Sequence, residues 1–530
     1  MKFSKSTWAA VGATLLVAAC GGGGGSGPAG TQNSNPGRGE LMQSPPPRIT
    51  SLSATDYTSR LAATATGQGL LTLSTGSASG PLPCGIDVQY LKYGTVGGKG
   101  EATTASAALI VPTGTSAQCT GERPIVLFAH GTTVEKRYNL ADFADSTNPA
   151  YSQAQLLAAV FAAQGYIVVA PNYAGYDSST LSYHPFLVAD QQSKDMIDAL
   201  TAAKSALPTL ISSTKASAKL FITGYSQGGH VAMATVKALQ DAGVAVTASA
   251  PMSGPYAMGL YGDAIVSGKV PAGSTTLMPM LINGYQKTYG SIYGTASDFY
   301  ESNFAGGMEA AFPGSYTSTT LVTSGVVPEL ALFSSTEPTG FVGAGITPPT
   351  TGTASQNALW AAGFGTNNLI KNSVRTAYMT DAVTNPSTGG GAIPPASPAH
   401  PLRVALKAND FRSWTGPTTS YMLLCGGSSD PTVYYSANTS TMVALWAAKV
   451  SAHQVTELDV DSSTPRSDSF ESARLGFRAS LAKVQSDAAA AATAAGADPT
   501  AAAGKATLAY YHSGVAPYCT AAARGFFSAF

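Results

Sequence analysis

The sequence predicts an α/β fold, in which helices cover both faces of a mostly parallel sheet. Short apolar runs at 124–128 and 166–170 have the composition of strands buried on both faces. Amphipathic stretches of helical length, at 153–165 and 188–206, alternate with these runs. A glycine-rich turn then joins an apolar strand at 218–223 to the helix that follows it. Strands and helices in alternation favour parallel pairing through crossover helices.

The remaining elements extend this alternation in both directions along the chain. Two β-like runs, 88–93 and 106–111, precede it and are expected to pair antiparallel. Residues 488–503 consist mainly of Ala, Gly and Thr and fit either a helix or a mobile loop. The other expected elements are helices at 230–239, 435–450 and 470–483 and strands at 244–250, 421–424 and 454–458.

A long segment between 254 and 400 interrupts the alternation and is rich in Gly, Tyr, Ser, Thr and Pro. It is too long for a loop, so we predict an inserted cap or lid over the C-terminal edge of the sheet, where α/β proteins place their sites. Its many aromatic side chains fit either a binding pocket or a core of the insertion itself. The predicted organisation is a signal peptide (1–19), a tether (20–50), a core in two parts (51–253 and 401–530) and the insertion (254–400).

The N-terminus has the features of a bacterial lipoprotein signal. Lys2 and Lys5 precede an apolar run at 8–18 that is too short to span a bilayer as a stable helix. Val17-Ala18-Ala19-Cys20 resembles a lipobox, which implies that Cys20 is lipidated and begins the mature chain. An ordinary signal peptide cleaved near residue 19 is the alternative. Either reading predicts export, to the outer membrane or the extracellular space, followed by a flexible Gly/Ser/Pro-rich tether.

Four further cysteines imply two disulfides in an exported chain. Of the three possible connectivities we favour Cys84–Cys119 and Cys425–Cys519. The formal net charge is zero and only 11% of residues are charged, so nothing suggests a nucleic-acid partner. We expect a monomer whose membrane contact is limited to a lipid anchor.

The glycine-rich turn carries the strongest functional signal. It reads Gly224-Tyr225-Ser226-Gln227-Gly228, and a strand, Gly-x-Ser-x-Gly and a helix in succession are the context of a nucleophile elbow. The flanking glycines are expected because strand and helix pass too close for a Cβ. An ordinary serine in a glycine-rich turn is the alternative, but both flanks favour Ser226 as a nucleophile.

A serine hydroxyl needs a base, and a histidine oriented by a carboxylate commonly supplies it. Only six histidines exist, and in this order of elements the acid and then the histidine follow the serine. Elimination leaves His512, expected in a loop before a final helix. Asp430 follows a late strand and a glycine-rich turn and is the predicted acid, with Asp459, Asp461 and Asp468 as competitors.

Two backbone N–H groups would complete such a site by stabilising an oxyanion. Gln227 supplies the first, because it follows the nucleophile. Thr132 supplies the second, in the loop His130-Gly131-Thr132 after an early strand. His130 is expected to be a structural hydrogen-bonding residue under that loop. The proposed Cys425–Cys519 bridge would then fix the acid and base segments together.

These motifs together resemble the α/β-hydrolase superfamily, and more narrowly the secretory lipases of the lipase A type and their bacterial esterase relatives. The resemblance covers residue 86 to the end and departs at Asn172, which is often aspartate in relatives. The narrower match rests on Pro171-Asn172-Tyr173-Ala174-Gly175, His184-Pro185-Phe186, Pro251-Met252-Ser253-Gly254-Pro255-Tyr256, Asn409-Asp410-Phe411 and Trp414.

The resemblance implies hydrolysis of carboxylic esters through an acyl-enzyme, with Ser226, His512 and Asp430 as triad and no metal or organic cofactor. Glycerides, short-chain esters and polyesters all remain open as substrates. A serine peptidase of the prolyl-peptidase kind shares the triad, but neither a propeller nor an acidic amine-binding pair is readable here. An inactive binding protein on a hydrolase fold is the third reading, against which the intact triad argues.

Overall fold

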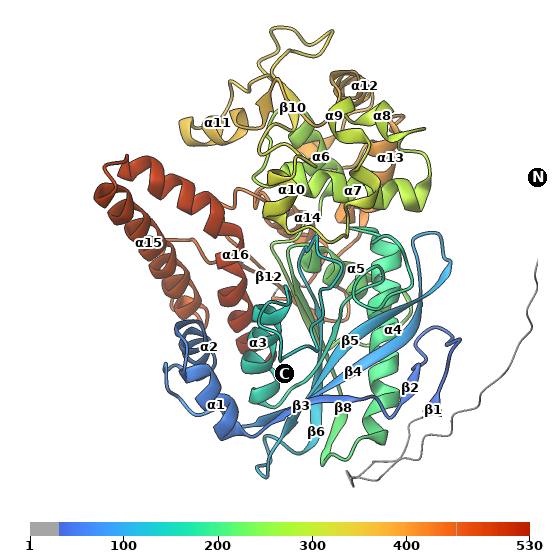
Figure 1. Ribbon diagram of the computed structural model, residues 1–530, viewed down its shortest axis with the longest axis vertical. Coiled ribbons are helices and arrows are strands. Elements are labelled where there is room, and N and C mark those ends of the chain that lie inside the picture. The colour runs from blue at the N-terminus through green and yellow to red at the C-terminus, as the bar shows by residue number, and fades with distance from the viewer. Residues whose placement is uncertain (1–30, 452) are drawn as a thin grey trace, which may run out of the picture.

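The structure is a computed structural model that describes residues 31–451 and 453–530. A nine-stranded sheet forms its centre (Figure 1). The six strands from β13 to β7 run parallel, and β5, β4 and β3 continue the sheet antiparallel, which confirms the predicted architecture. In sheet order the strands are β13 (Val455–Asp459), β12 (Tyr421–Gly426), β9 (Ala248–Met252), β8 (Thr214–Tyr225), β6 (Gly121–Ala129), β7 (Ile167–Pro171), β5 (Ala102–Thr113), β4 (Gly85–Val96) and β3 (Arg48–Leu52).

Helices cover both faces of this sheet (Figure 1). One face carries α4 (Ala189–Ala206) and α5 (Gln227–Asp241), which pack against each other and against the strands. The helices of the opposite face are α1 (Ala54–Ala62), α2 (Ala65–Thr75), α3 (Tyr151–Val160) and α16 (Pro499–Phe527), with α15 (Glu471–Ala494) paired to α16. Helix α14 (Thr439–Trp446) packs on β12 and β13 and lies on the α5 side, because Trp446 contacts Gly416, whose carbonyl accepts a hydrogen bond from Gln240 of α5. The apolar sides of these helices and the buried strands form one continuous core.

Strand register brings the loops of the site to one edge of the sheet. Ala129 at the end of β6 pairs with Gly224 of β8, and Tyr225 at the end of β8 pairs with Met252 of β9. Met252 in turn lies beside Cys425 near the end of β12. The segments that follow these parallel strands therefore emerge side by side, as expected at the carboxyl edge of such a sheet.

The residues between β9 and β12 fold largely over that edge as a cap, here residues 254–408 (Figure 1). The cap has its own buried apolar cluster. Its elements are α6 (Met258–Val266), α7 (Ser274–Tyr289), α8 (Ala296–Phe299), α9 (Ser302–Ala305), α10 (Ser318–Thr323), β10 (Phe333–Ser334), α11 (Ala354–Ala361), β11 (Phe364–Gly365), α12 (Asn372–Thr384) and α13 (Pro401–Ala408). Helix α13 follows the predicted boundary at residue 400, yet Leu402, Ala405 and Leu406 belong to the cap cluster.

One local expectation was wrong, and one open alternative is decided in favour of helix. His512 lies inside the long helix α16 and not in a loop before a final helix. The alanine-rich segment 488–503 forms the end of α15, a short turn and the start of α16, so the two helices make an antiparallel hairpin. Because alanine has the highest helix propensity, a run of this composition extends a helix wherever a cap permits. Asp498 supplies that cap, since its carboxylate accepts the N–H of Thr500 and Ala501.

The described part of the segment predicted as a tether, residues 31–50, is structured. Residues 20–30 of that segment, with Cys20 and the signal segment 1–19, lie outside the described residues. From residue 31 the chain forms β1 (Thr31–Gln32), β2 (Gln43–Ser44) and the start of β3. Arg38 makes two hydrogen bonds of 3.0 Å to Asp198 on α4, so this part is held against the body.

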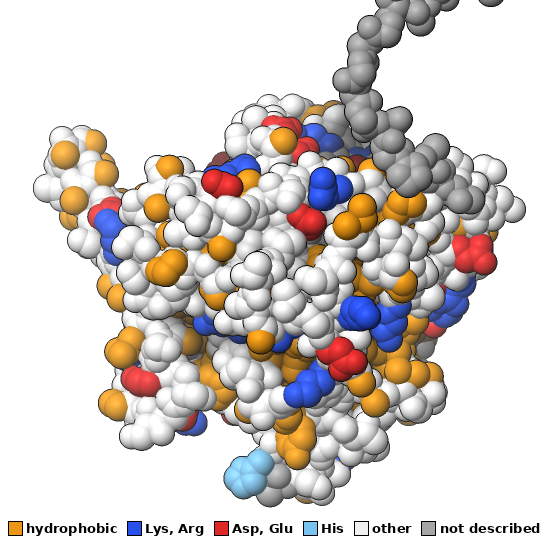
Figure 2. Space-filling model, turned by 90° about the horizontal axis from the view of Figure 1, so that it is seen from below, with side chains coloured by type: hydrophobic (Ala, Val, Ile, Leu, Met, Phe, Trp, Pro, Cys, Tyr) orange, Lys and Arg blue, Asp and Glu red, His pale blue; other side chains and the backbone are white. Residues whose placement is uncertain are grey.

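The described surface carries few charges, scattered among uncharged side chains on the face that Figure 2 shows. Across the described residues, every helix is either too short or too polar to cross a membrane. Both favoured disulfides, Cys84–Cys119 and Cys425–Cys519, are formed. Disulfides persist in oxidising compartments, so this pairing indicates an exported protein.

Candidate active site

Ser226 lies at a sharp turn between β8 and α5. Its φ of 59° and ψ of −118° are strained for a residue with a side chain. The neighbouring glycines make the turn possible. A Cβ at Gly224 would lie 2.3 Å from the carbonyl oxygen of Gly228, and one at Gly228 would lie 2.0 Å from that of Ala129. The elbow geometry predicted from the motif is therefore present.

His512 and Asp430 join Ser226 in one chain of hydrogen bonds. His512 Nε2 is 2.8 Å from Ser226 Oγ, and His512 Nδ1 is 2.7 Å from Asp430 Oδ2. With the proton on Nδ1 donated to the carboxylate, Nε2 is free to accept the serine proton. The side chain of Asp430 is 1% exposed and that of His512 is 17% exposed, so the acid is shielded while the imidazole stays accessible.

The acid is held by its own loop. The other carboxylate oxygen of Asp430 accepts the N–H of Thr432 at 2.9 Å and of Val433 at 3.1 Å. Its competitors have other partners: Asp461 accepts a hydrogen bond from Tyr511, and Asp468 pairs with Arg474. Asp430 is thus the carboxylate in contact with the imidazole of His512.

The predicted oxyanion donors lie beside Ser226. Gln227 begins α5, where first-turn N–H groups lack intrahelical partners. Thr132 lines the same two cavities as Ser226. Between them, a Cβ built on Gly131 would lie 3.8 Å from the Cβ of Ser226 and 3.3 Å from the carbonyl of Tyr225. The loop that carries Thr132 therefore passes directly against the nucleophile turn.

His130 supports this loop from below, as expected. Its ring contacts the carbonyl oxygens of Gly131 at 2.6 Å and Asn172 at 3.1 Å, and it stacks on Tyr138 and Tyr173. Burial lowers the pKa of His130 to about 4, so the ring is neutral. The amide of Asn172 also fixes the neighbouring chain, because its oxygen accepts the N–H of Leu140 at 2.8 Å.

Two contacts around the site were not anticipated. The hydroxyl of Tyr225 donates to the carbonyl oxygen of His512, which ties the residue before the nucleophile to the helix of the base. The side-chain amide of Gln227 donates to Nε2 of His184 at 2.6 Å. His184 donates from Nδ1 to the carbonyl of Ala174, and burial lowers its pKa to about 3. In the sequence, only the motif His184-Pro185-Phe186 drew attention to this residue.

Comparison with known proteins agrees with the geometry. Residues 152–265 match the prolyl oligopeptidase family. No curated protein was found to match the chain. Among solved structures, a ligand-bound form of the rice cell wall degrading esterase LipA from Xanthomonas oryzae is similar at 25% identity and a TM-score of 0.61, covering 80% of this chain and 91% of that one. A putative hydrolase from Legionella pneumophila has 16% identity and a TM-score of 0.56, covering 78% and 90%.

The chain has the α/β-hydrolase fold. The similarity of its fold to LipA and the family match identify it as an esterase- or lipase-like hydrolase. Candida antarctica lipase A also matches, at 11% identity and a TM-score of 0.44, covering 80% of this chain and 77% of that one.

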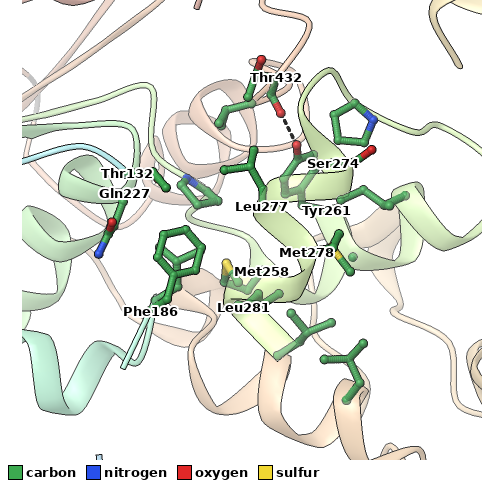
Figure 3. A pocket seen from close by; sticks show the side chains of 18 of the residues that line it. Thr132, Phe186, Gln227, Met258, Tyr261, Ser274, Leu277, Met278, Leu281 and Thr432 are labelled. Atoms are coloured by element: carbon green, nitrogen blue, oxygen red, sulfur yellow. Dashed lines mark hydrogen bonds between the residues drawn. The ribbon is translucent and has the colours of Figure 1, made fainter. Parts of the chain in front are cut away.

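Two cavities of this α/β hydrolase meet at Ser226 and Thr132. The first is an apolar cavity between the site and the cap (Figure 3). Gly284 brings α7 close to the segment before α4, since a Cβ there would lie 2.9 Å from the amide nitrogen of Phe186. The apolar side chains that line the cavity include Phe186, Met258, Tyr261, Leu277, Met278 and Leu281.

The second cavity is a groove of about 1360 Å³ that opens to solvent. His512 lines the groove, together with residues of α16, of the cap and of the Gly131–Val134 loop. Of the cap aromatics, Tyr261 and Tyr378 line the apolar cavity, whereas most others are buried in the cap cluster away from it. They form the core of the cap and are not a pocket lining.

Proposed function

We propose that this protein is a serine carboxylic ester hydrolase that acts through an acyl-enzyme. The observation that carries the proposal is the continuous hydrogen-bond chain from Ser226 through His512 to Asp430. Such a chain makes a serine nucleophilic and lets one imidazole serve both as base and as acid. The similarity to LipA, a cell wall degrading esterase, supports esters as the substrate class.

The steps follow from the geometry. Ser226 Oγ attacks the ester carbonyl while its proton moves to His512 Nε2. The imidazolium, stabilised by Asp430, then gives that proton to the leaving alcohol as the C–O bond breaks. Water next loses a proton to His512 and attacks the acyl-enzyme, and the proton returns to Ser226 as the acid leaves. The N–H groups of Thr132 and Gln227 stabilise the oxyanion in both halves, each by roughly 3–4 kcal/mol.

Each of the two cavities accommodates one end of the ester, either the alcohol or the acyl chain. The leaving oxygen must face His512 Nε2, because that atom protonates it. His512 lines the groove, and within the described chain Ser226 is the one triad residue among those lining the apolar cavity. The leaving alcohol therefore lies in the groove and the acyl chain in the apolar cavity, whose walls favour an aliphatic acid.

Substitution of Ser226 by Ala tests the reaction directly. We expect Ser226→Ala to abolish hydrolysis of p-nitrophenyl butyrate, with circular dichroism and the unfolding temperature unchanged, because only one partly exposed hydroxyl is removed. A chain-length series of p-nitrophenyl esters, with emulsified triglyceride and a polyester film beside it, then measures the acyl preference. Activity near that of the unmodified protein in the Ser226→Ala variant would reject the mechanism.

A serine peptidase is the second candidate, since residues 152–265 match the prolyl oligopeptidase family. Peptidases that remove dipeptides need acidic side chains to bind the substrate amine. The apolar cavity has no charged side chain among its described lining residues, and Glu329 is the one carboxylate that lines the groove. Parallel assays on a proline p-nitroanilide and on the matching p-nitrophenyl ester separate the candidates, and we expect turnover of the ester alone.

We also propose export with a lipid on Cys20. The support is the lipobox-like Val17-Ala18-Ala19-Cys20 sequence and the two disulfides of the described chain. Metabolic labelling with an alkyne-modified palmitate should tag the protein, and the Cys20→Ser variant should lose the tag. Equal labelling of both proteins would reject the anchor without affecting the proposed reaction.

A further inference from the structure

The groove is larger than an ester hydrolase needs for a small alcohol. Ligand pockets for small molecules commonly hold about 300–1,000 Å³, whereas this groove has a volume of about 1360 Å³. Ser226 and His512 both line it, so a substrate bound there has the reacting carbon inside the groove. The volume lies on the leaving-group side, where His512 delivers its proton.

One wall of the groove is a face of α16. Lys505, Ala509, His512 and Ala516 follow one another at helical spacing and all line the groove. The outer half of the α15–α16 hairpin stands beside the cap, beyond the edge of the sheet (Figure 1). The small side chain of Ala509 is exposed on this wall. The hairpin thus lengthens the groove well past the catalytic histidine without filling it.

The opposite wall belongs to the cap. The start of α7 and the residues of α11, among them the exposed Ala358, line this side. Besides His512, the described side chains lining the groove that carry a formal charge are one acid and one base, Glu329 and Lys505. Their formal charges cancel, and both walls otherwise present small, hydroxyl-bearing or apolar side chains. A neutral chain therefore fits this lining better than a charged one.

We propose that the groove between α16 and the cap binds an uncharged oligomeric alcohol, so that the favoured substrates are esters of a short aliphatic acid with an extended neutral leaving group. This inference rests on the proposed ester hydrolysis and adds the chemistry of the alcohol. Contacts along the groove lie remote from the reacting carbon, and their binding energy raises kcat/KM for long alcohols over short ones.

Butyrate monoesters of ethylene glycol and of its longer oligomers test the proposal. Every member has the same leaving oxygen on the same ethylene unit, so the series changes groove occupancy and leaves the chemistry of bond cleavage alone. Hydrolysis is followed by titration of the released acid. We expect kcat/KM to rise by at least about tenfold along the series and to level off once the groove is filled.

Two variants narrow the groove, one from each wall: Ala509→Trp on α16 and Ala358→Trp on α11. Both residues are exposed, so an indole is accommodated without repacking a core. Each variant should flatten the length dependence, measured as the ratio of kcat/KM for the longest ester to kcat/KM for the ethylene glycol ester. Ala482→Trp on α15 is the matched control, because Ala482 is exposed on the hairpin but does not line the groove.

The outcomes separate the two proposals. A kcat/KM independent of alcohol length, with the short ester still cleaved through Ser226, would overturn the groove proposal alone. A rise with length that Ala509→Trp and Ala358→Trp leave intact would also overturn it, because the oligomer would then bind elsewhere. Failure to cleave any ester of the series would reject the proposed function itself.

Discussion

At the scale of single residues, the site depends on how tightly the nucleophile turn is held to the helix of the base. Tyr225 precedes Ser226 and donates its hydroxyl to the carbonyl of His512. Burial raises the pKa of Tyr225 well above its usual value, so the hydroxyl stays protonated and remains a donor. The same hydroxyl lies 3.4 Å from His512 Nδ1, next to the contact with Asp430. Tyr225 is therefore a positioning residue for His512.

The Tyr225→Phe variant should lower kcat for p-nitrophenyl butyrate by about fivefold, the effect of roughly 1 kcal/mol from one lost hydrogen bond. KM should change little, because the hydroxyl positions the base and does not contact the acyl chain. Tyr256→Phe is the matched control, since Tyr256 is also buried and its hydroxyl has no hydrogen-bond partner in the described structure. An unchanged kcat in Tyr225→Phe would show that Tyr225 does not position His512.

The residue scale is also where sequence reasoning was most informative. A count of six histidines and the chain order of the motif were sufficient to select His512, and the structure places it beside Ser226. The contact between Gln227 and His184 could not be derived in this way. It joins residues 43 positions apart, through side chains whose directions depend on the tertiary fold.

At the scale of elements, α16 is fastened to the acid loop beside the triad. Tyr511 accepts the N–H of Ser429 at 3.0 Å and donates to Asp461 at 2.6 Å. The Cys425–Cys519 disulfide joins the end of β12 to the same helix, two turns after His512. Because the base stands on a helix, its position depends on these ties as well as on local packing.

Removal of the Cys425–Cys519 bridge by a double Ala variant should lower the free energy of unfolding by roughly 4–5 kcal/mol for its 94-residue separation. It should also lower kcat in the folded protein, because α16 is freed from the acid loop. The Cys84–Cys119 bridge spans 35 residues and lies at the edge of the sheet away from Ser226. Its removal should reduce stability and leave kcat unchanged, and a fall in kcat in both variants would contradict this distinction.

Element types were predictable in the sheet region and much less so in the cap and hairpin. The apolar strands and the elbow helix can be recognised in the sequence. A strand that is buried on both faces leaves a continuous apolar run. Helix α7 was missed since Pro279 and Gly284 interrupt it, although Gly284 permits its close contact with the Phe186 segment. The helical state of 488–503 is decided by pairing of α15 with α16, a tertiary contact that composition does not record.

At the scale of the whole molecule, three buried histidines make stability depend on pH. Burial lowers the pKa of His130 and of His230 to about 4 and that of His184 to about 3. Because these folded values lie below the unfolded value of about 6.5, the unfolded chain binds more protons between pH 6.5 and pH 4. Stability is therefore fully present above that window and falls as the pH is lowered through it.

Each histidine should lower the free energy of unfolding by roughly 2 kcal/mol when the pH falls from 7 to 5. The His230→Asn variant tests this, because asparagine can still donate to the carbonyl of Pro255 but does not titrate. Urea unfolding at both pH values should show a difference smaller by about 2 kcal/mol than in the unmodified protein. His453→Asn is the control, since His453 is exposed, and an identical pH dependence in all three proteins would contradict the account.

The central claim is that Ser226 is an activated nucleophile, and covalent labelling measures this most directly. A fluorophosphonate probe should react stoichiometrically with the native protein, abolish ester hydrolysis, and appear by mass spectrometry on Ser226 alone. The His512→Ala variant, which keeps the serine but lacks the base, should label far more slowly. Label on another residue, or full ester hydrolysis with Ser226 completely modified, would contradict the account.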